Sequence, residues 1–290
     1  MSEWLNTLLQ GILLGGLYSL LATGLALSFG VMRMVNIAHG DFAILAAYGA
    51  IAVVEPLGLN PFLVLLLIVP LMAAFGYGLQ RLVLNRTLGQ DILPPLLVTF
   101  GLSIIIQNLL LVTFSADTRS LGVGPLGIAS VALGGDVAVG VLPLITMLVA
   151  LVVLSGLQWV FSETPLGRAF RAASDDSEAA QLMGINNRHI YGLAMAIAMA
   201  LVAVAGVFLA MRANISPADG PARLLYAFEA VIIGGLGSLW GTLAGGIILG
   251  VAQSIGLKAD PGWGILAGHL AFLAVLVVRP NGLFARTRDR

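Results

Sequence analysis

Long apolar runs alternate with short polar segments along almost the whole chain. Runs with few charged residues cover about 7–30, 62–80, 92–114, 139–161, 190–211 and 263–279, a shorter run covers 42–57, and a longer one covers 225–257. A helix needs roughly 20 apolar residues to cross the hydrocarbon core of a bilayer. The pattern therefore predicts an all-α protein, a polytopic transmembrane helical bundle.

The run 225–257 decides how often the chain crosses the membrane. It is too long for one untilted crossing, and glycines interrupt it at 234–238. Cytoplasmic segments collect Lys and Arg, and both the loop 162–189 and the tail from Arg279 are rich in Arg. Both lie inside only if 225–257 crosses twice, which gives nine spans with the N-terminus outside and the C-terminus inside. All basic residues then lie inside except Arg119, Arg212, Arg223 and Lys258. Because the first half of this run is short and can be re-entrant, we expect eight to nine spans with broken or re-entrant helices.

Composition agrees with a membrane protein. Of the 290 residues, 59% are hydrophobic and only 10% are charged, against about 25% charged residues in a typical soluble domain. The 36 glycines suit helices that pack closely in lipid. The absence of Cys excludes disulfides and thiolate metal sites. The first residues lack the basic region of a cleaved signal peptide, so we treat the first apolar run as a retained span of a single membrane domain over 1–290.

The loop 162–189 contains two short helices by its capping pattern. Thr164 followed by Pro165 is typical of an N-cap with Pro at the first helical position. A second helix starts at Asp175, Asp176 or Ser177, whose side chains accept hydrogen bonds from free amides at a helix start.

The second helix has a compact apolar surface formed by Ala179, Ala180, Leu182 and Met183, and Gly184 ends it. A short helix with firm stops at both ends suits docking into a groove on another protein. The alternative is an ordinary connecting loop with a surface helix, and the loop alone does not decide between them.

Several segments resemble those of known importer permeases. Residues 178–184, with Glu-Ala-Ala, three further residues and Gly184, resemble the EAA-x-x-x-G signature of bacterial importer permeases. TPLGRAFRA at 164–172 resembles the lead-in of the branched-chain amino acid permeases of the high-affinity leucine, isoleucine and valine importer. The region 15–42, with GGLYSL, FGVMR and NIAHGDF, is similar to the first helix and break of that family, and EAVIIGGLGSLWG at 229–241 is similar to its late glycine-rich helix pair. The length fits the shorter of its two permease types.

The resemblance implies a permease subunit of a binding-protein-dependent ABC importer in a bacterial inner membrane, with the ABC importer permease fold and alternating access. It implies a second, longer permease or a second copy of the chain, two ATP-binding subunits, a periplasmic or extracellular solute-binding protein and a branched-chain amino acid substrate, without a nucleic-acid partner. The resemblance assigns contact with the ATPase to ten residues of the loop, namely Thr164, Pro165, Gly167, Arg168, Arg171, Asp175, Glu178, Ala179, Ala180 and Gly184.

Polar residues inside the apolar pattern are candidates for the translocation path or a subunit interface, because irregular backbone and ionisable groups in a membrane need protein or water around them. These candidates are Asn36, His39, Asp41, Glu229, Gly234, Gly235 and Gly237. The alternatives are a wet interfacial turn near Arg33 for the first three, and a headgroup-level position beside Arg223 for Glu229. We interpret His269, alone in the last span, as a structural histidine.

Missing motifs restrict the chemistry. The sequence has no G-x-x-x-x-G-K-[ST] loop, and its only lysine, Lys258, lacks the flanking glycines. ATP hydrolysis therefore belongs to separate subunits, and the chain is not expected to be an enzyme. Its three histidines are too scattered for a metal site, and no cofactor is expected. Competing hypotheses are a permease of the same family for urea, amides or other amino acids, and an ATP-independent secondary transporter, which would explain broken helices but not the capped loop.

Overall fold

The computed structural model describes residues 2–89, 91, 93–134 and 137–284. In these ranges the helices are α1 (Ser2–Met32), α2 (His39–Leu57), α3 (Leu65–Leu82), α4 (Leu93–Phe114), α5 (Val141–Glu163), α6 (Pro165–Asp175), α7 (Ser177–Leu182), α8 (Asn187–Arg212), α9 (Gly220–Gly234), α10 (Leu239–Ala259) and α11 (Trp263–Val278). Short 3₁₀ turns cover η1 (Leu84–Arg86) and η2 (Gly124–Gly127), and β1 (Ser130–Gly134) pairs antiparallel with β2 (Val137–Gly140). Seven helices of the described chain are long and apolar enough to cross a membrane, so the predicted all-α transmembrane bundle is confirmed.

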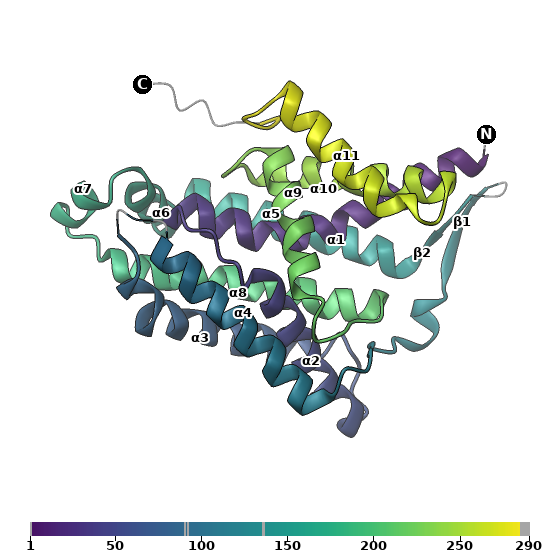
Figure 1. Ribbon diagram of the computed structural model, residues 1–290, viewed down its shortest axis with the longest axis horizontal. Helices are drawn as coiled ribbons and strands as arrows, with labels where there is room; N and C mark the ends of the chain where they lie inside the picture. Colours follow the sequence, from purple (N-terminus) through teal and green to yellow (C-terminus); the bar gives the residue numbers. More distant parts are fainter. Residues whose placement is uncertain (1, 90, 92, 135–136, 285–290) are drawn as a thin grey trace.

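Helix α1 is the central element of the bundle. It is 31 residues long and packs against α5, α8, α9 and α10 (Figure 1). Its glycines permit close approach of the neighbouring backbones: a Cβ on Gly15 would collide with Ile247 of α10, and a Cβ on Gly16 would lie 2.9 Å from the Met147 Cα of α5. Small residues at such contacts let helices gain van der Waals contact that lipid cannot replace.

The connection from α1 to α2 folds back into the bundle. Residues 33–38 are not helical, and a hydrogen bond of 2.8 Å joins His39 Nε2 to the Leu21 carbonyl in the middle of α1. Helix α2 therefore begins beside the middle of α1 rather than at its end. The break that the polar sequence at 36–41 predicted is present.

Helix α9 runs across α1 instead of along it (Figure 1). Its first residue, Gly220, packs against Gly40 of α2, and its last, Gly234, packs against Gly241 of α10. At 1.5 Å per residue its 15 residues reach roughly 22 Å, less than the thickness of a bilayer core.

The return from the end of α8 to the start of α10 is thus assembled from three pieces. The segment 213–219 lies beside α2, where Tyr48 Oη donates to the Ile215 carbonyl at 3.1 Å. Helix α9 follows, and the turn 235–238 brings the chain close to Gly30 of α1. The predicted split of 225–257 at its glycines is confirmed, and the first part of this return is a broken crossing.

The hairpin and η2 were not predicted from the sequence. They lie in the segment that joins α4 to α5, where the antiparallel register pairs Ser130 with Gly140. The side chain of Gln10 in α1 donates to the Ala138 carbonyl at 3.3 Å, which places β2 near the first turns of α1. Alternation in so short a stretch is too weak to distinguish a strand from a loop.

Replacing Gly15 with Ala should destabilise the protein by about 1–3 kcal/mol, because the added methyl group meets the backbone of α10 and forces the helices apart. The thermal unfolding midpoint of the detergent-solubilised protein measures this. Gly156→Ala is the matched control, since Gly156 lies inside α5 and a Cβ added there would have no atom within 4 Å. Equal midpoints for the two variants would contradict the close-packing role of Gly15.

Candidate functional site

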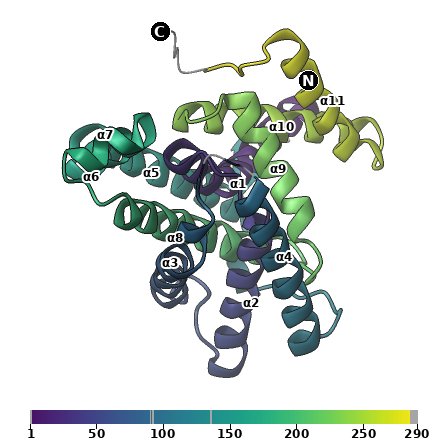
Figure 2. The same ribbon diagram turned by 60° about the vertical axis from the view of Figure 1, so that its left-hand side comes forward.

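Helices α6 and α7 form a pair at one end of the bundle, next to the end of α5 (Figure 2). Thr164 caps α6 as predicted, since its side chain accepts from the Gly167 amide at 3.1 Å. Gly167 permits the tight turn from α5 into α6, because a Cβ there would collide with the backbone of Phe161 in α5. The aromatic rings of Phe161 and Phe170 then pack 5.4 Å apart and hold α6 on α5.

Helix α7 has fixed ends and an exposed apolar tip. Of the three predicted caps the structure selects Asp176, whose Oδ1 accepts from the amides of Glu178 and Ala179 at 3.0 Å. Gly184 ends the helix with φ +86°, a conformation that favours glycine. Leu182 and Met183 are 89% and 82% exposed. Helix α7 thus presents two large, exposed apolar side chains at its tip.

The predicted coupling residues divide into two groups. Ala180 and Gly167 are buried and serve packing, and Thr164 and Arg171 are partly buried, with Arg171 donating to the Phe161 carbonyl at the end of α5. The other six predicted residues are exposed, namely Pro165, Arg168, Asp175, Glu178, Ala179 and Gly184.

Three hydrogen bonds that the sequence did not reveal tie this pair to the spans. Ser174 Oγ donates to the Gly30 carbonyl at 2.7 Å, and Arg33 donates to the Ser174 carbonyl at 3.0 Å, so α6 is bonded to the end of α1. Asn187 Nδ2 donates to the Ser177 carbonyl at 2.6 Å, so α7 is bonded to the start of α8. These bonds join distant residues, and no local pattern marks them.

The polar residues at the start of α2 are buried. Asn36, His39 and Asp41 are each 1% exposed, so they do not form the wet interfacial turn considered from the sequence. Asn36 Oδ1 accepts from the Ala38 amide at 3.1 Å and stabilises the turn. Asp41 Oδ1 accepts from Gln107 of α4 at 2.9 Å. The start of α2 is thereby held to α1 and α4 by polar contacts.

The α4 side of this contact was missed. Thr99, Ser103 and Gln107 follow at intervals of four residues and therefore share one face of α4. Thr99 Oγ1 accepts from the Ile37 amide at 3.2 Å, and Gln107 bonds both Ser103 and Asp41. The regular spacing of three polar residues in an apolar span was the signal that could have found them.

Glu229 lies at the centre of a second polar cluster, where α9 meets α11. It is 2% exposed and bonded to His269 Nδ1 at 2.5 Å. Arg223 pairs with Asp219 at 3.3 Å rather than with Glu229. The ring of Tyr226 stacks against that of His269 at a centroid distance of 6.3 Å.

The three glycines predicted beside Glu229 shape the turn from α9 to α10. Gly235 and Gly237 have φ of +100° and +85°. At Gly234 any Cβ would collide with Gly241. Their role in the structure is therefore a tight turn and a close helix contact.

A bundle of apolar helices with a capped, exposed helix pair at one end suits a membrane-spanning transport subunit, and the match to a family of transport permeases identifies the class as an ABC transporter permease, not an enzyme. Residues 7–277 match the family described as branched-chain amino acid transport system / permease component. The chain belongs to this family.

Individual relatives agree with the family. The chain is 32% identical to the high-affinity branched-chain amino acid transport system permease protein BraD of Pseudomonas aeruginosa, over 98% of this chain and 96% of the relative. It is 26% identical to the corresponding LivH protein of Escherichia coli K12, with the same coverage. The solved structure of PsaBC from Streptococcus pneumoniae in complex with Fab shares the fold, with a TM-score of 0.52, 17% identity and coverage of 96% of both chains.

A double-mutant cycle on Glu229 and His269 should give an interaction energy of about 1–2 kcal/mol, because changing His269 to Leu leaves the buried Glu229 carboxyl without its partner. Unfolding of the solubilised protein by denaturant measures the four free energies. The same cycle on Glu55 and Arg119, which are 53% and 34% exposed, should give less than about 1 kcal/mol. Similar energies for both pairs would contradict the importance of burial.

Proposed function

We propose that the chain is the permease subunit of a branched-chain amino acid importer that works with two ATP-binding subunits, a second permease and an external solute-binding protein. The relatives named for this transport are similar over nearly the whole chain, which supports leucine, isoleucine and valine as substrates. Affinity can reside in the binding protein, so the permease needs no tight amino acid site. The second permease is a longer chain or a second copy of this one.

The observation that carries this proposal is the exposed tip of α7. Leu182 and Met183 present an apolar surface, and the charged side chains of Glu178 in α7 and Arg168 in the adjoining α6 are also exposed. An apolar anchor with a polar rim is the composition expected of a protein contact. We assign this surface to a groove on the ATP-binding subunit.

The bonds of α6 and α7 give the route by which the ATPase moves the spans. A displacement of α7 acts on α8 through Asn187, and a displacement of α6 acts on α1 through Ser174 and on α5 through Arg171. In the proposed cycle, ATP binding brings the two ATPase subunits together and tilts these helices, which opens the path to alternate sides of the membrane.

The arrangement of the ends supports the proposed orientation. Two residues, Ser174 of α6 and Gly237 before α10, lie close to Gly30 near the Met32 end of α1. Leu283, near the C-terminus, is bonded to the last turn of α9. At the other side of α1, Lys258 pairs with Glu3 at 3.2 Å. In the proposed orientation the α6 end faces the cytoplasm, the first residues of α1 lie outside, and the membrane is a bacterial inner membrane. Arg286, Arg288 and Arg290, which entered the sequence argument, lie outside the described residues.

Changing Leu182 to Ser should weaken binding of the ATP-binding subunit by roughly tenfold or more, because it removes an apolar anchor from the contact. Co-purification of tagged permease with its ATPase measures binding. Ile128→Ser is the matched control, since Ile128 is also 89% exposed but belongs to the segment between α4 and α5. Gly184→Val should act like Leu182→Ser, because valine resists φ +86°. Full binding by both α7 variants would remove α7 from the interface.

Proteoliposomes that contain this chain with its partner subunits should take up labelled leucine only when ATP and the binding protein are present. The α7 variants should lose this uptake while the spans stay folded. Another relative, the fructose import permease protein FrcC of Rhizobium meliloti, is 29% identical over 89% of this chain. ATP-dependent uptake of urea, an amide or a sugar in place of leucine would replace the substrate and keep the importer. Uptake by this chain alone without ATP would identify a secondary transporter.

A further inference from the structure

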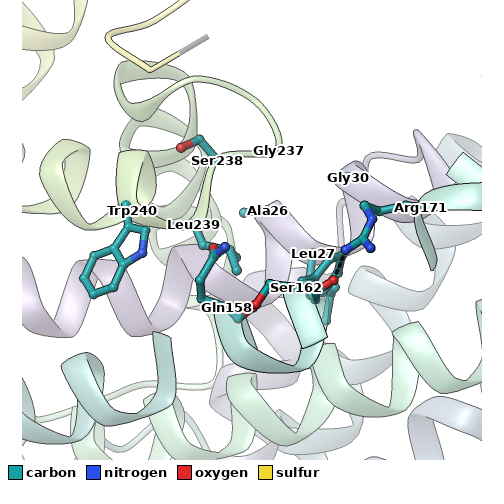
Figure 3. Close-up of a pocket in the computed structure, with 11 residues that line it drawn as sticks. Ala26, Leu27, Gly30, Gln158, Ser162, Arg171, Gly237, Ser238, Leu239 and Trp240 are labelled. Atoms are coloured by element: carbon teal, nitrogen blue, oxygen red, sulfur yellow. Dashed lines mark hydrogen bonds between the residues drawn. The ribbon is translucent and has the colours of Figure 1, made fainter. Parts of the chain in front are cut away.

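A cavity of about 230 Å³ lies on the flank of α1, between the end of α5 and the start of α10 (Figure 3). Helix α6 closes its third side with Arg171. In Figure 3, Arg171 and Trp240 stand at opposite sides of the cavity, with Gln158 and Ser162 between them. The cavity lies beside Gly30, near the last turn of α1, and therefore at the level where the spans end.

The lining groups favour an anion. Arg171 is the cation of the lining, and the described residues around the cavity include no Asp or Glu. A guanidinium has five N–H donors, more than the single Phe161 carbonyl can accept, and its planar fork matches phosphate oxygens. The Gln158 amide and the Ser162 hydroxyl add neutral hydrogen-bonding groups to the same wall.

The start of α10 adds to this preference. Leu239 and Trp240 are the first residues of this 21-residue helix, and both line the cavity. The positive end of the helix dipole favours negative charge at that place. The hydroxyl of Ser238 caps the helix by accepting from the Gly241 amide at 3.1 Å. Two positive elements from separate parts of the chain, Arg171 and the α10 start, thus face one cavity.

The surroundings are those of a membrane interface. Trp240 is 45% exposed at the rim of the cavity, and Trp159 is 61% exposed beside Gln158 in the same helix. Tryptophan is enriched at the headgroup level of bilayers, where its ring is partly apolar and its N–H reaches polar groups. Farther from the α6 end of the bundle, the exposed surfaces of α5 and α10 are apolar and suit acyl chains.

An amino acid substrate fits this cavity poorly. A zwitterion needs an acceptor for its ammonium group, and the described lining has no carboxylate to supply one. A phosphodiester group needs only the donors and the positive field that are present.

We propose that this cavity binds the phosphodiester headgroup of an anionic phospholipid from the surrounding bilayer, with Arg171 as its principal contact. Basic pockets between spans at the membrane surface are a recurring form of lipid recognition. The bound lipid would bridge α6 and the start of α10, and so connect the α6 and α7 pair to the glycine turn at 235–238. Arg171 would then contact the lipid headgroup in the cavity, whereas Arg168, three residues earlier, is exposed.

The test uses the permease purified with its partner subunits and measures retained phosphatidylglycerol by native mass spectrometry. The protein is first exchanged into vesicles of phosphatidylcholine alone or of phosphatidylcholine and phosphatidylglycerol in equal amounts. Wild type should retain phosphatidylglycerol in preference to phosphatidylcholine. Arg171→Gln and Gln158→Glu should each weaken this retention by roughly tenfold, because they remove the cation or place a carboxylate beside it.

Arg168→Gln is the matched control and should retain as much lipid as wild type, since it makes the same charge change on the same helix outside the cavity. Gln158→Glu retains the Arg171 side chain and changes α5 rather than α6, so loss of lipid in that variant does not depend on a substitution in α6. Unchanged retention in both cavity variants would overturn the proposal. Displacement of the lipid by millimolar inorganic phosphate would also overturn it, because the site would then take a free anion. These readouts measure lipid and do not depend on the substrate or on ATP-driven uptake.

Discussion

The close approach of α1 and α10 is the contact on which the rest of the structure depends. Gly11 and Gly15 of α1 meet Gly246 and Gly250 of α10 with no space for a Cβ on any of the four. Lipid gives two apolar helices little reason to associate, so van der Waals contact and hydrogen bonds have to hold them together. The glycines supply this contact along several turns. Other parts of α1 contact α5, α8 and α9.

The breaks at 33–38 and 213–219 are possible because protein surrounds them. An unpaired amide in hydrocarbon costs several kcal/mol, so irregular backbone at membrane depth needs partners. The first break uses Thr99 and Asn36, which accept from the backbone amides of Ile37 and Ala38. In the second, the Ile215 carbonyl accepts from Tyr48. Some of the buried polar side chains in this chain therefore satisfy backbone groups at the places where helices stop.

Local chemistry made part of this structure predictable. Thr164 and Gly184 act within a few residues of their partners, so sequence alone located the start of α6 and the end of α7, and apolar runs located the spans. The hydrogen bond between Glu229 and His269 could not be predicted, because the two residues are 40 positions apart and only the packing of α11 on α9 brings them together. Periodicity also indicates that a segment is helical without giving its direction, so the path of α9 across α1 could not be predicted. Arg168 and Arg171 looked equivalent on the sequence, and only the fold turns one inward.

Under the proposed mechanism, a force on α7 reaches several spans together rather than passing along one. Ser174 is bonded to the end of α1, and Ser177 is bonded to Asn187 at the start of α8. Helix α6 is also packed on α5 through the ring of Phe170. Because α1 is a rod of 31 residues held to α10 by its glycines, a push at its end would tilt α1 and α10 as one body rather than bend either. Helix α9 contacts this body near Gly241 and contacts α2 near Gly40. The relative motion would therefore concentrate at the two glycine ends of α9, where the helix backbones approach each other closely.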